Sequence, residues 1–158
     1  MKLKVFYSWQ SDLPNKTNRQ FIQNCLKKAL NKILDDNLTI SEYVIESDSR
    51  GESGTPELAS TIFAKIDQCD IFVADISIIN STFECRKVCN PNVLIELGYA
   101  SCKLGWEKIL CVYNLSFGKI EDLPFDIRHR KPLVYNSDSN LLVNNLINQL
   151  QSIIDNHI

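Results

Sequence analysis

One short stretch of the chain, residues 70–76, limits the possible fold more than any other. Its sequence, DIFVADI, is a continuous apolar run apart from Asp70 and Asp75. A run of this kind is typical of a β-strand that is covered on both faces, as strands are in parallel sheets. We therefore expect a central strand here, with helices packed on both sides of it.

Strand and helix patterns alternate along the rest of the chain. Strands are predicted at residues 2–9, 42–47, 70–76, 108–113 and 132–135. Helices are predicted from Asn15 or Thr17 to about Asp35, from Thr55 to about Gln68, from Asn90 to near Gly105, and from Ser137 or Asp138 onward, with a long connection over 114–131. The alternation predicts one α/β domain of 158 residues, a doubly wound five-stranded parallel sheet with helices on both faces.

The spacing of apolar residues predicts which side of each helix faces the sheet. The second predicted helix should bury Leu58, Ile62 and Ile66. The last predicted helix should bury Leu141, Leu142, Leu146, Ile147, Leu150, Ile153 and Ile154.

The third predicted helix carries one acid in an otherwise apolar sequence. Asn90 suits the cap position, and Pro91 fits the first helical position, where a missing N–H is tolerated. Glu96 follows between Ile95 and Leu97, and an apolar environment makes a carboxylate costly to bury. The alternative is that Glu96 lies on a solvated face of the helix. Because ligands bind beyond the carboxyl ends of the strands in such sheets, we expect Glu96 to point toward that edge.

Composition excludes several classes of protein. The formal net charge is -2, which gives no basic stripe for nucleic acid and no membrane-seeking surface. The sequence contains no apolar run of about 20 residues and no signal peptide, so we expect a cytoplasmic protein. The six cysteines form no Cys-x-x-Cys pair, and we expect reduced thiols and no metal site, although Cys85 and Cys89 lie in one loop.

Four motifs in order give the chain a family resemblance. They are VFYSWQSD at 5–12, DIFVADIS at 70–77, PNVLIELGYA at 91–100 and LPFDIR at 123–128. Together they resemble bacterial TIR-like (Toll/interleukin receptor-like) domains, including those fused to bacterial STING receptors in anti-phage defence. The segment from Glu96 to Ala100 also resembles nucleoside 2-deoxyribosyltransferases.

The resemblance implies a flavodoxin-like fold and an enzyme that cleaves NAD+ at the nicotinamide–ribose bond. The catalytic glutamate of the family falls on Glu96. NAD+ would be the substrate, and no further cofactor is implied. The family further implies self-association through TIR–TIR contacts, and the absence of a sensor implies a separate partner protein or a larger receptor.

Further residues are candidates for binding the substrate. The candidates are Ser8, Trp9, Asp48, Asp75, Asn92 and Arg128. Trp9 or Tyr7 would stack on a base, while the other packs in the core. Asp75 has an alternative role in capping the end of its strand, and the basic run around Arg128 has one as a solvated edge.

The sequence also departs from the family. Better-known TIR domains carry a tryptophan a few residues before the catalytic glutamate, and this chain does not, so the aromatic wall would come from Trp9 or Phe83. No Gly-x-Gly-x-x-Gly motif supports a dehydrogenase-type site. Two alternatives stay open, a nucleotide-binding or scaffold module without catalysis, and a transferase that exchanges nucleoside bases.

Overall fold

A computed structural model of the chain describes residues 1–36, 39–47 and 57–158. In these residues five parallel strands form one sheet in the order β2-β1-β3-β4-β5. The strands are β1 (Lys2–Ser8), β2 (Glu42–Glu46), β3 (Ile71–Asp75), β4 (Ile109–Asn114) and β5 (Leu133–Tyr135). This order is that of a flavodoxin-like doubly wound sheet, as the alternation of elements predicts.

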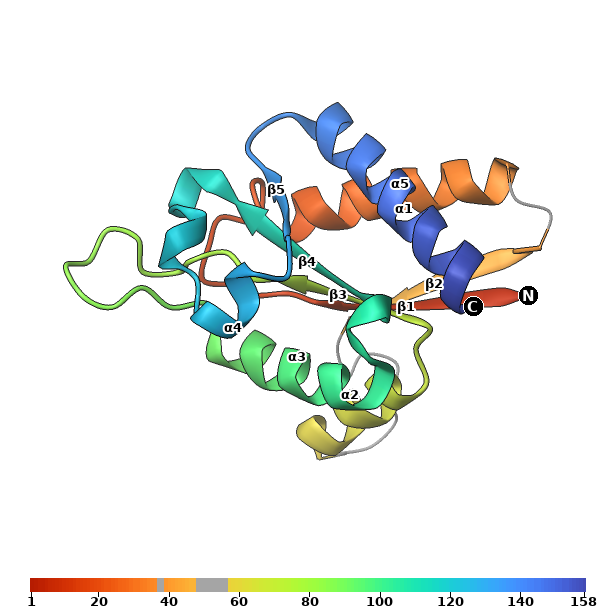
Figure 1. Ribbon diagram of the computed structural model, residues 1–158, viewed down its shortest axis with the longest axis horizontal. Helices are drawn as coiled ribbons and strands as arrows, with labels where there is room; N and C mark the ends of the chain where they lie inside the picture. Colours follow the sequence, from red (N-terminus) through yellow and green to blue (C-terminus); the bar gives the residue numbers. More distant parts are fainter. Residues whose placement is uncertain (37–38, 48–56) are drawn as a thin grey trace.

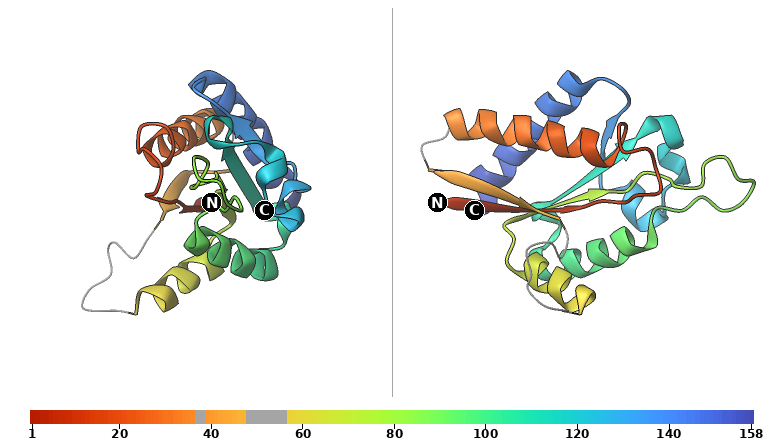
Figure 2. Two further views of the ribbon diagram at one scale, coloured as in Figure 1. Left: turned by 90° about the vertical axis from the view of Figure 1, so that its left-hand side faces the viewer. Right: turned by 180° about the vertical axis from the view of Figure 1, so that it is seen from behind.

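Helices cover both faces of the sheet (Figure 1). The described helices are α1 (Arg19–Asp36), α2 (Leu58–Asp67), α3 (Pro91–Leu104), α4 (Phe125–Arg128) and α5 (Ser139–His157), with short 3-10 turns η1 (Trp106–Lys108), η2 (Leu115–Phe117) and η3 (Ile120–Asp122). Helices α1 and α5 lie on one face, and α2 and α3 on the other (Figures 1 and 2).

Side chains alternate between two apolar cores, one on each face of the sheet. Along β1, Leu3, Val5 and Tyr7 join the core under α1 and α5, while Phe6 joins the core over α2 and α3. Strands β3 and β4 divide their side chains between the same two cores. The face on which a residue lies therefore follows from its place in the strand, and this places the functional candidates.

The start of α1 differs from the prediction. The helix begins at Arg19, later than Asn15 or Thr17, because residues 14–18 form a turn in which the amides of Thr17 and Asn18 bond the carbonyl of Pro14, each at 3.1 Å. The side chain of Asn18 is fully buried and belongs to a polar cluster at the sheet edge. Tertiary hydrogen bonds therefore determine where this helix begins, and the spacing of its apolar residues does not.

For two residues the prediction of burial in the core is wrong. Leu58 is 59% exposed at the first turn of α2, and Leu141 is 52% exposed at the first turn of α5. In each helix the first fully buried residue comes later, Ile66 in α2 and Leu142 in α5. Asp138 caps α5, since its side chain accepts bonds from the amides of Asn140 and Leu141. The predicted start at Thr55 and Pro56 lies outside the described residues.

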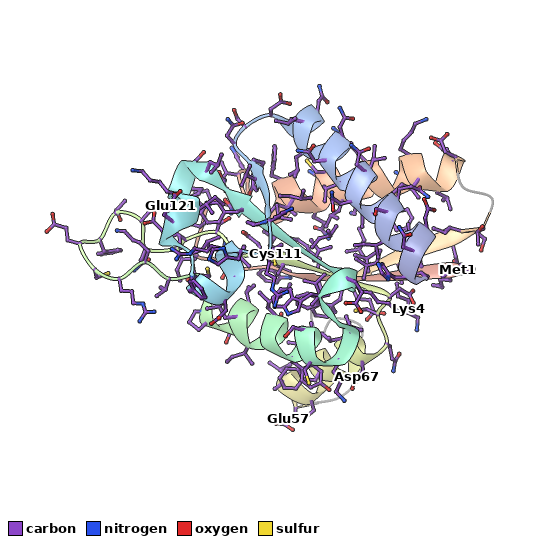
Figure 3. The ribbon with its side chains drawn as sticks, viewed as in Figure 1. Met1, Lys4, Glu57, Asp67, Cys111 and Glu121 are labelled. Atoms are coloured by element: carbon purple, nitrogen blue, oxygen red, sulfur yellow. The ribbon has the colours of Figure 1, made fainter. Side chains whose placement is uncertain are left out.

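The sheet has two functionally different ends. Figure 3 shows Met1 and Lys4 at one end of the molecule and Glu121, which follows β4, at the other. The carboxyl ends of the strands point toward the second of these ends, where ligands bind in this architecture. No described helix is long and apolar enough to span a membrane.

Candidate functional site

Helix α3 begins at the carboxyl-terminal edge of the sheet. The Asn90 side chain accepts hydrogen bonds from the amides of Asn92 at 2.9 Å and Val93 at 3.1 Å, and Pro91 occupies the first turn, as predicted. The amide Nδ2 of Asn90 also donates to Asp12 Oδ2 at 2.6 Å. Since Asp12 lies in the loop after β1, this bond ties the start of α3 to the end of the first strand.

Glu96 lies on the side of α3 that meets β1. Its carboxylate accepts a hydrogen bond from the Ser8 hydroxyl, at the last residue of β1. Ser8 is fully buried, while Glu96 is half-buried. Neighbouring Ile95 is 60% exposed and Leu97 is buried, so Glu96 lies at the boundary between core and solvent.

Burial raises the pKa of the Glu96 carboxyl, and the hydrogen bond from Ser8 opposes that rise. In the described part of the chain, Ser8 is the one group that donates to this carboxylate. An ionised carboxylate offers about four acceptor positions. Glu96 is therefore a poorly hydrated acid that retains the capacity to interact with a ligand.

The position of this pair in the topology is also informative. Strand β1 lies between β2 and β3, so the chain leaves β1 toward one edge of the sheet and later returns to its other side. The carboxyl end of β1 is thus next to the topological switch point, where doubly wound sheets bind ligands. Ser8 and Glu96 meet at this point.

Asp75 lies at the same edge but on the opposite face. Its Oδ2 accepts from Gln10 Nε2 at 2.9 Å and from Asn18 Nδ2 at 3.0 Å, and its Oδ1 accepts from the Ser77 amide at 3.1 Å. All four residues are 2% exposed or less. The structure therefore uses Asp75 to hold the loop after β1 and does not bring it together with Glu96.

The buried polar cluster extends to the end of β4. The Asn114 side chain donates to the carbonyl of Thr17 at 3.2 Å and to Asn18 Oδ1 at 3.1 Å. Ser77 Oγ accepts from the Asn114 amide at 2.9 Å, and the Tyr135 hydroxyl donates to the Thr17 carbonyl at 2.8 Å. Ser77 and Asn114 directly follow the apolar runs at 70–76 and 108–113, but these local patterns did not predict the network. Its one visible signal is a polar residue directly after each apolar run.

Trp9 lies on the same face as α1, away from Glu96. The guanidinium carbon of Arg19 lies 3.3 Å from the centroid of its ring, and the ring packs against the core under α1 and α5. Its Nε1 is buried and has no hydrogen-bond partner among the described residues. Tyr7 is fully buried in the same core. The structure therefore pairs Trp9 with a cation and not with the candidate acid.

The other candidates have different surroundings. Asn92 is exposed in the first turn of α3, one turn before Glu96. Arg128 on α4 lies with its guanidinium carbon 5.2 Å from the centroid of the Phe125 ring, and α4 shares a core with α3 through Ile127. Asp48 lies outside the described residues.

Phe83 lies in the loop that joins β3 to α3. Its ring is 64% exposed, in a part of the loop that extends away from the body of the protein (Figure 1). The Lys87 ammonium group organises this loop by donating to the carbonyls of Ser81, at 2.9 Å, and Phe83. An isolated bridge between Ile78 and Cys89 closes its base. The predicted aromatic wall does not form at Glu96 from Trp9, and Phe83 contacts solvent.

The described residues contain no group of three or more His, Cys, Asp or Glu side chains arranged to hold a metal ion. Their cysteines are all free. The site is thus defined by a carboxylate, a buried hydroxyl and the start of a helix.

Comparisons with known proteins give a fold and no family. No protein-family model and no curated protein matches the chain. The flavodiiron core of Flv1 from Synechocystis superposes on 98% of the chain with a TM-score of 0.56 at 9% sequence identity. A flavo di-iron protein from Thermotoga maritima aligns with 96% of the chain, with a TM-score of 0.49 at 15% identity. The chain spans 36% of the length of each. The likeness to the Flv1 core supports the flavodoxin-like fold alone.

Proposed function

We propose that this chain cleaves the N-glycosidic bond between nicotinamide and ribose in NAD+, with Glu96 as the catalytic carboxylate. The observation that carries the proposal is the half-buried Glu96, which accepts a hydrogen bond from buried Ser8 next to the switch point of the sheet. The resemblance of the four motifs together to TIR-like domains indicates the substrate.

The chemistry needs only one carboxylate. As the bond between the ribose anomeric carbon and the nicotinamide nitrogen breaks, its electron pair leaves with nicotinamide, which departs as a neutral molecule. The ribose acquires oxocarbenium character, and the ionised Glu96 stabilises that positive charge. Water then adds to the anomeric carbon and releases a proton, which yields ADP-ribose. An internal nucleophile of the substrate in place of water would give a cyclic isomer.

The surroundings of Glu96 suit this role. A carboxylate that is partly withdrawn from water interacts more strongly with a developing cation than a fully hydrated one. Ser8 contributes by holding the carboxylate in one orientation and by favouring its ionised form. Asn92, one helical turn earlier and exposed, is placed to contact a sugar hydroxyl or the carboxamide.

The test compares Glu96→Gln with the wild-type chain at high protein concentration, because the family resemblance implies that assembly activates the domain. Nicotinamide released from NAD+ is measured by chromatography. We expect Glu96→Gln to lower the rate at least about 100-fold, since it removes the charge that stabilises the cation. The matched control is Glu42→Gln, an exposed acid of β2 at the opposite end of the sheet, which should keep the wild-type rate.

Other outcomes would replace the proposal with a different function. Equal nicotinamide release by Glu96→Gln and the wild type would remove Glu96 from the mechanism. Stoichiometric binding of NAD+ or FMN without any product would indicate a nucleotide-binding module. Exchange of a free base into a nucleoside, with NAD+ left intact, would indicate a transferase.

A further inference from the structure

A cavity lies away from Glu96, where β4 begins and α5 ends. It has a volume of about 330 Å³, within the range of small-molecule sites. A neighbouring cavity of about 340 Å³ shares six of its seven lining residues with the first. The residues common to both are Trp106, Glu107, Ile109, Cys111, Arg130 and Lys131. Figure 3 shows Cys111 near the middle of the molecule, between the two ends of the sheet.

The cavity exists because β5 is shorter than β4. Strand β5 pairs only with the residues of β4 from Val112 to Asn114. The earlier residues of β4, from Ile109 to Cys111, pair with β3 on one side, and within the described chain no strand covers their other side. Leu133 and Ile153 close the cavity from β5 and α5. The result is a hollow beside an open strand edge, lined by both apolar and polar side chains.

Arg130 provides a cationic group in the lining of this cavity. The guanidinium carbon of Arg130 is 4.2 Å from the centroid of the Trp106 ring, a distance typical of cation–π contact. An edge of a guanidinium group fits a carboxylate with two parallel hydrogen bonds. Lys131 follows with a φ of 49°, a left-handed conformation that is uncommon for residues other than glycine.

The charges around the cavity favour a ligand with one negative charge. Arg130 and Lys131 are positive and Glu107 is negative, which leaves one net positive charge. The carboxyl end of α5, where His157 lines the cavity, adds a partial negative charge. A carboxylate neutralises this charge, whereas a phosphate monoester, with a charge near −2, would leave an unneutralised negative charge beside Glu107 and the end of α5.

We propose that this cavity binds a small organic carboxylate. The carboxylate pairs with the guanidinium of Arg130, and the apolar body rests on Leu110, Leu133 and Ile153, which share one core. The site is separate from Glu96, and the proposal does not depend on NAD+ cleavage.

The test follows the indole N–H signal of Trp106 by NMR while phenylacetate is added to the full chain. The chain has two tryptophans, so Trp9→Phe identifies the signal of Trp106. We expect a saturable shift of that signal with phenylacetate. Phenylethanol, which has no charge, and phenyl phosphate should bind at least about ten-fold more weakly.

Arg130→Gln distinguishes pairing of the carboxylate with Arg130 from nonspecific binding of phenylacetate. We expect it to weaken phenylacetate binding at least about ten-fold, because it removes the charged donor and leaves the exposed position polar. The matched control is Arg86→Gln, an exposed arginine in the loop between β3 and α3, which should bind as the wild type does. Equal binding of phenylethanol, tighter binding of phenyl phosphate, or unchanged binding by Arg130→Gln would each overturn the proposal.

Discussion

Asp75 and Glu96 both lie at the carboxyl-terminal edge of the sheet, on opposite faces and in different surroundings. Asp75 is fully buried and accepts three hydrogen bonds, from Gln10, Asn18 and the Ser77 amide. Glu96 is half-buried and accepts one, from Ser8. The first acid thus has its charge compensated by fixed donors, and the second does not.

The difference shows that two acids at one edge of a sheet can have different roles, one in stability and one in interacting with a ligand. A buried carboxylate with a full set of donors stabilises the groups around it and has little left to offer a ligand. A carboxylate with a raised pKa and one donor is less well solvated, and charge that develops on a ligand can compensate it. Three substitutions test this comparison, from the largest expected effect to the smallest.

Asp75→Ala should have the largest effect, and that effect should be on stability. The substitution removes the acceptor of the buried Gln10 Nε2, one of the two acceptors of the buried Asn18 Nδ2, and the acceptor of the Ser77 amide. We expect the free energy of unfolding to fall by about 3–5 kcal/mol, as when one partner of a buried charged group is removed. Urea unfolding followed by circular dichroism measures the change. Asp126→Ala, at an exposed position of α4, is the control and should change stability by less than about 0.5 kcal/mol. A comparably small loss for Asp75→Ala would mean that the cluster does not hold the loop.

Ser8→Ala should have an intermediate effect, and that effect should be on the pKa of the Glu96 carboxyl. The Ser8 hydroxyl is the group that lowers the pKa of Glu96 against the effect of burial, so its removal should raise that pKa further. The acidic limb of the pH–rate profile for nicotinamide release should then move to higher pH. We expect the rate at neutral pH to fall about ten-fold, in line with the loss of one hydrogen bond to a charged group.

A direct titration makes this prediction independent of activity. Carbon-13 NMR of the protein labelled at glutamate measures the pKa of the Glu96 carboxyl in the wild type and in Ser8→Ala. Ser101→Ala is the matched control, since its hydroxyl bonds the Gly98 carbonyl on the same helix and does not contact Glu96. A Glu96 pKa that stays unchanged in Ser8→Ala would show that this hydrogen bond does not tune the acid.

Much of the fold follows from local patterns in the sequence. The apolar run at 70–76 specifies a doubly covered strand, and Asn90 with Pro91 specifies the start of α3, both of which the structure contains. Because α3 begins at the carboxyl end of the sheet, an acid early in this helix must lie near that edge. The approximate place of Glu96 was therefore predictable from the residues before it.

The partners of the candidate residues were not predictable in the same way. Ser8 and Trp9 are adjacent in sequence, but strand alternation sends the first toward Glu96 and the second toward Arg19. Asn18 falls in a helical pattern and is instead fixed by contacts with Asp75, 57 residues away. Such long-range hydrogen bonds depend on how the elements pack, and local periodicity carries no information about them.

The effect of Glu96→Gln on stability should be the smallest of these effects, and it should be stabilising. Burial raises the pKa of Glu96 in the folded chain above that of an unfolded glutamate, which is about 4.3. Between these two values the folded state binds the proton more readily, so the free energy of unfolding falls as the pH rises through that window. Above the folded-state pKa the ionised acid therefore lowers stability, and below about pH 4 the penalty disappears because both states are protonated.

At pH 7 we expect Glu96→Gln to raise the free energy of unfolding by about 1 kcal/mol or less, because a half-exposed group keeps part of its hydration. For a chain of this size, that corresponds to about 2–4 °C in Tm. Thermal unfolding at pH 7 and pH 4 measures it, and the gain should be absent at pH 4. The exposed control Glu42→Gln should show no gain at either pH. A loss of stability in Glu96→Gln at pH 7 would mean that the ionised Glu96 carboxylate stabilises the folded state, as Asp75 is expected to do.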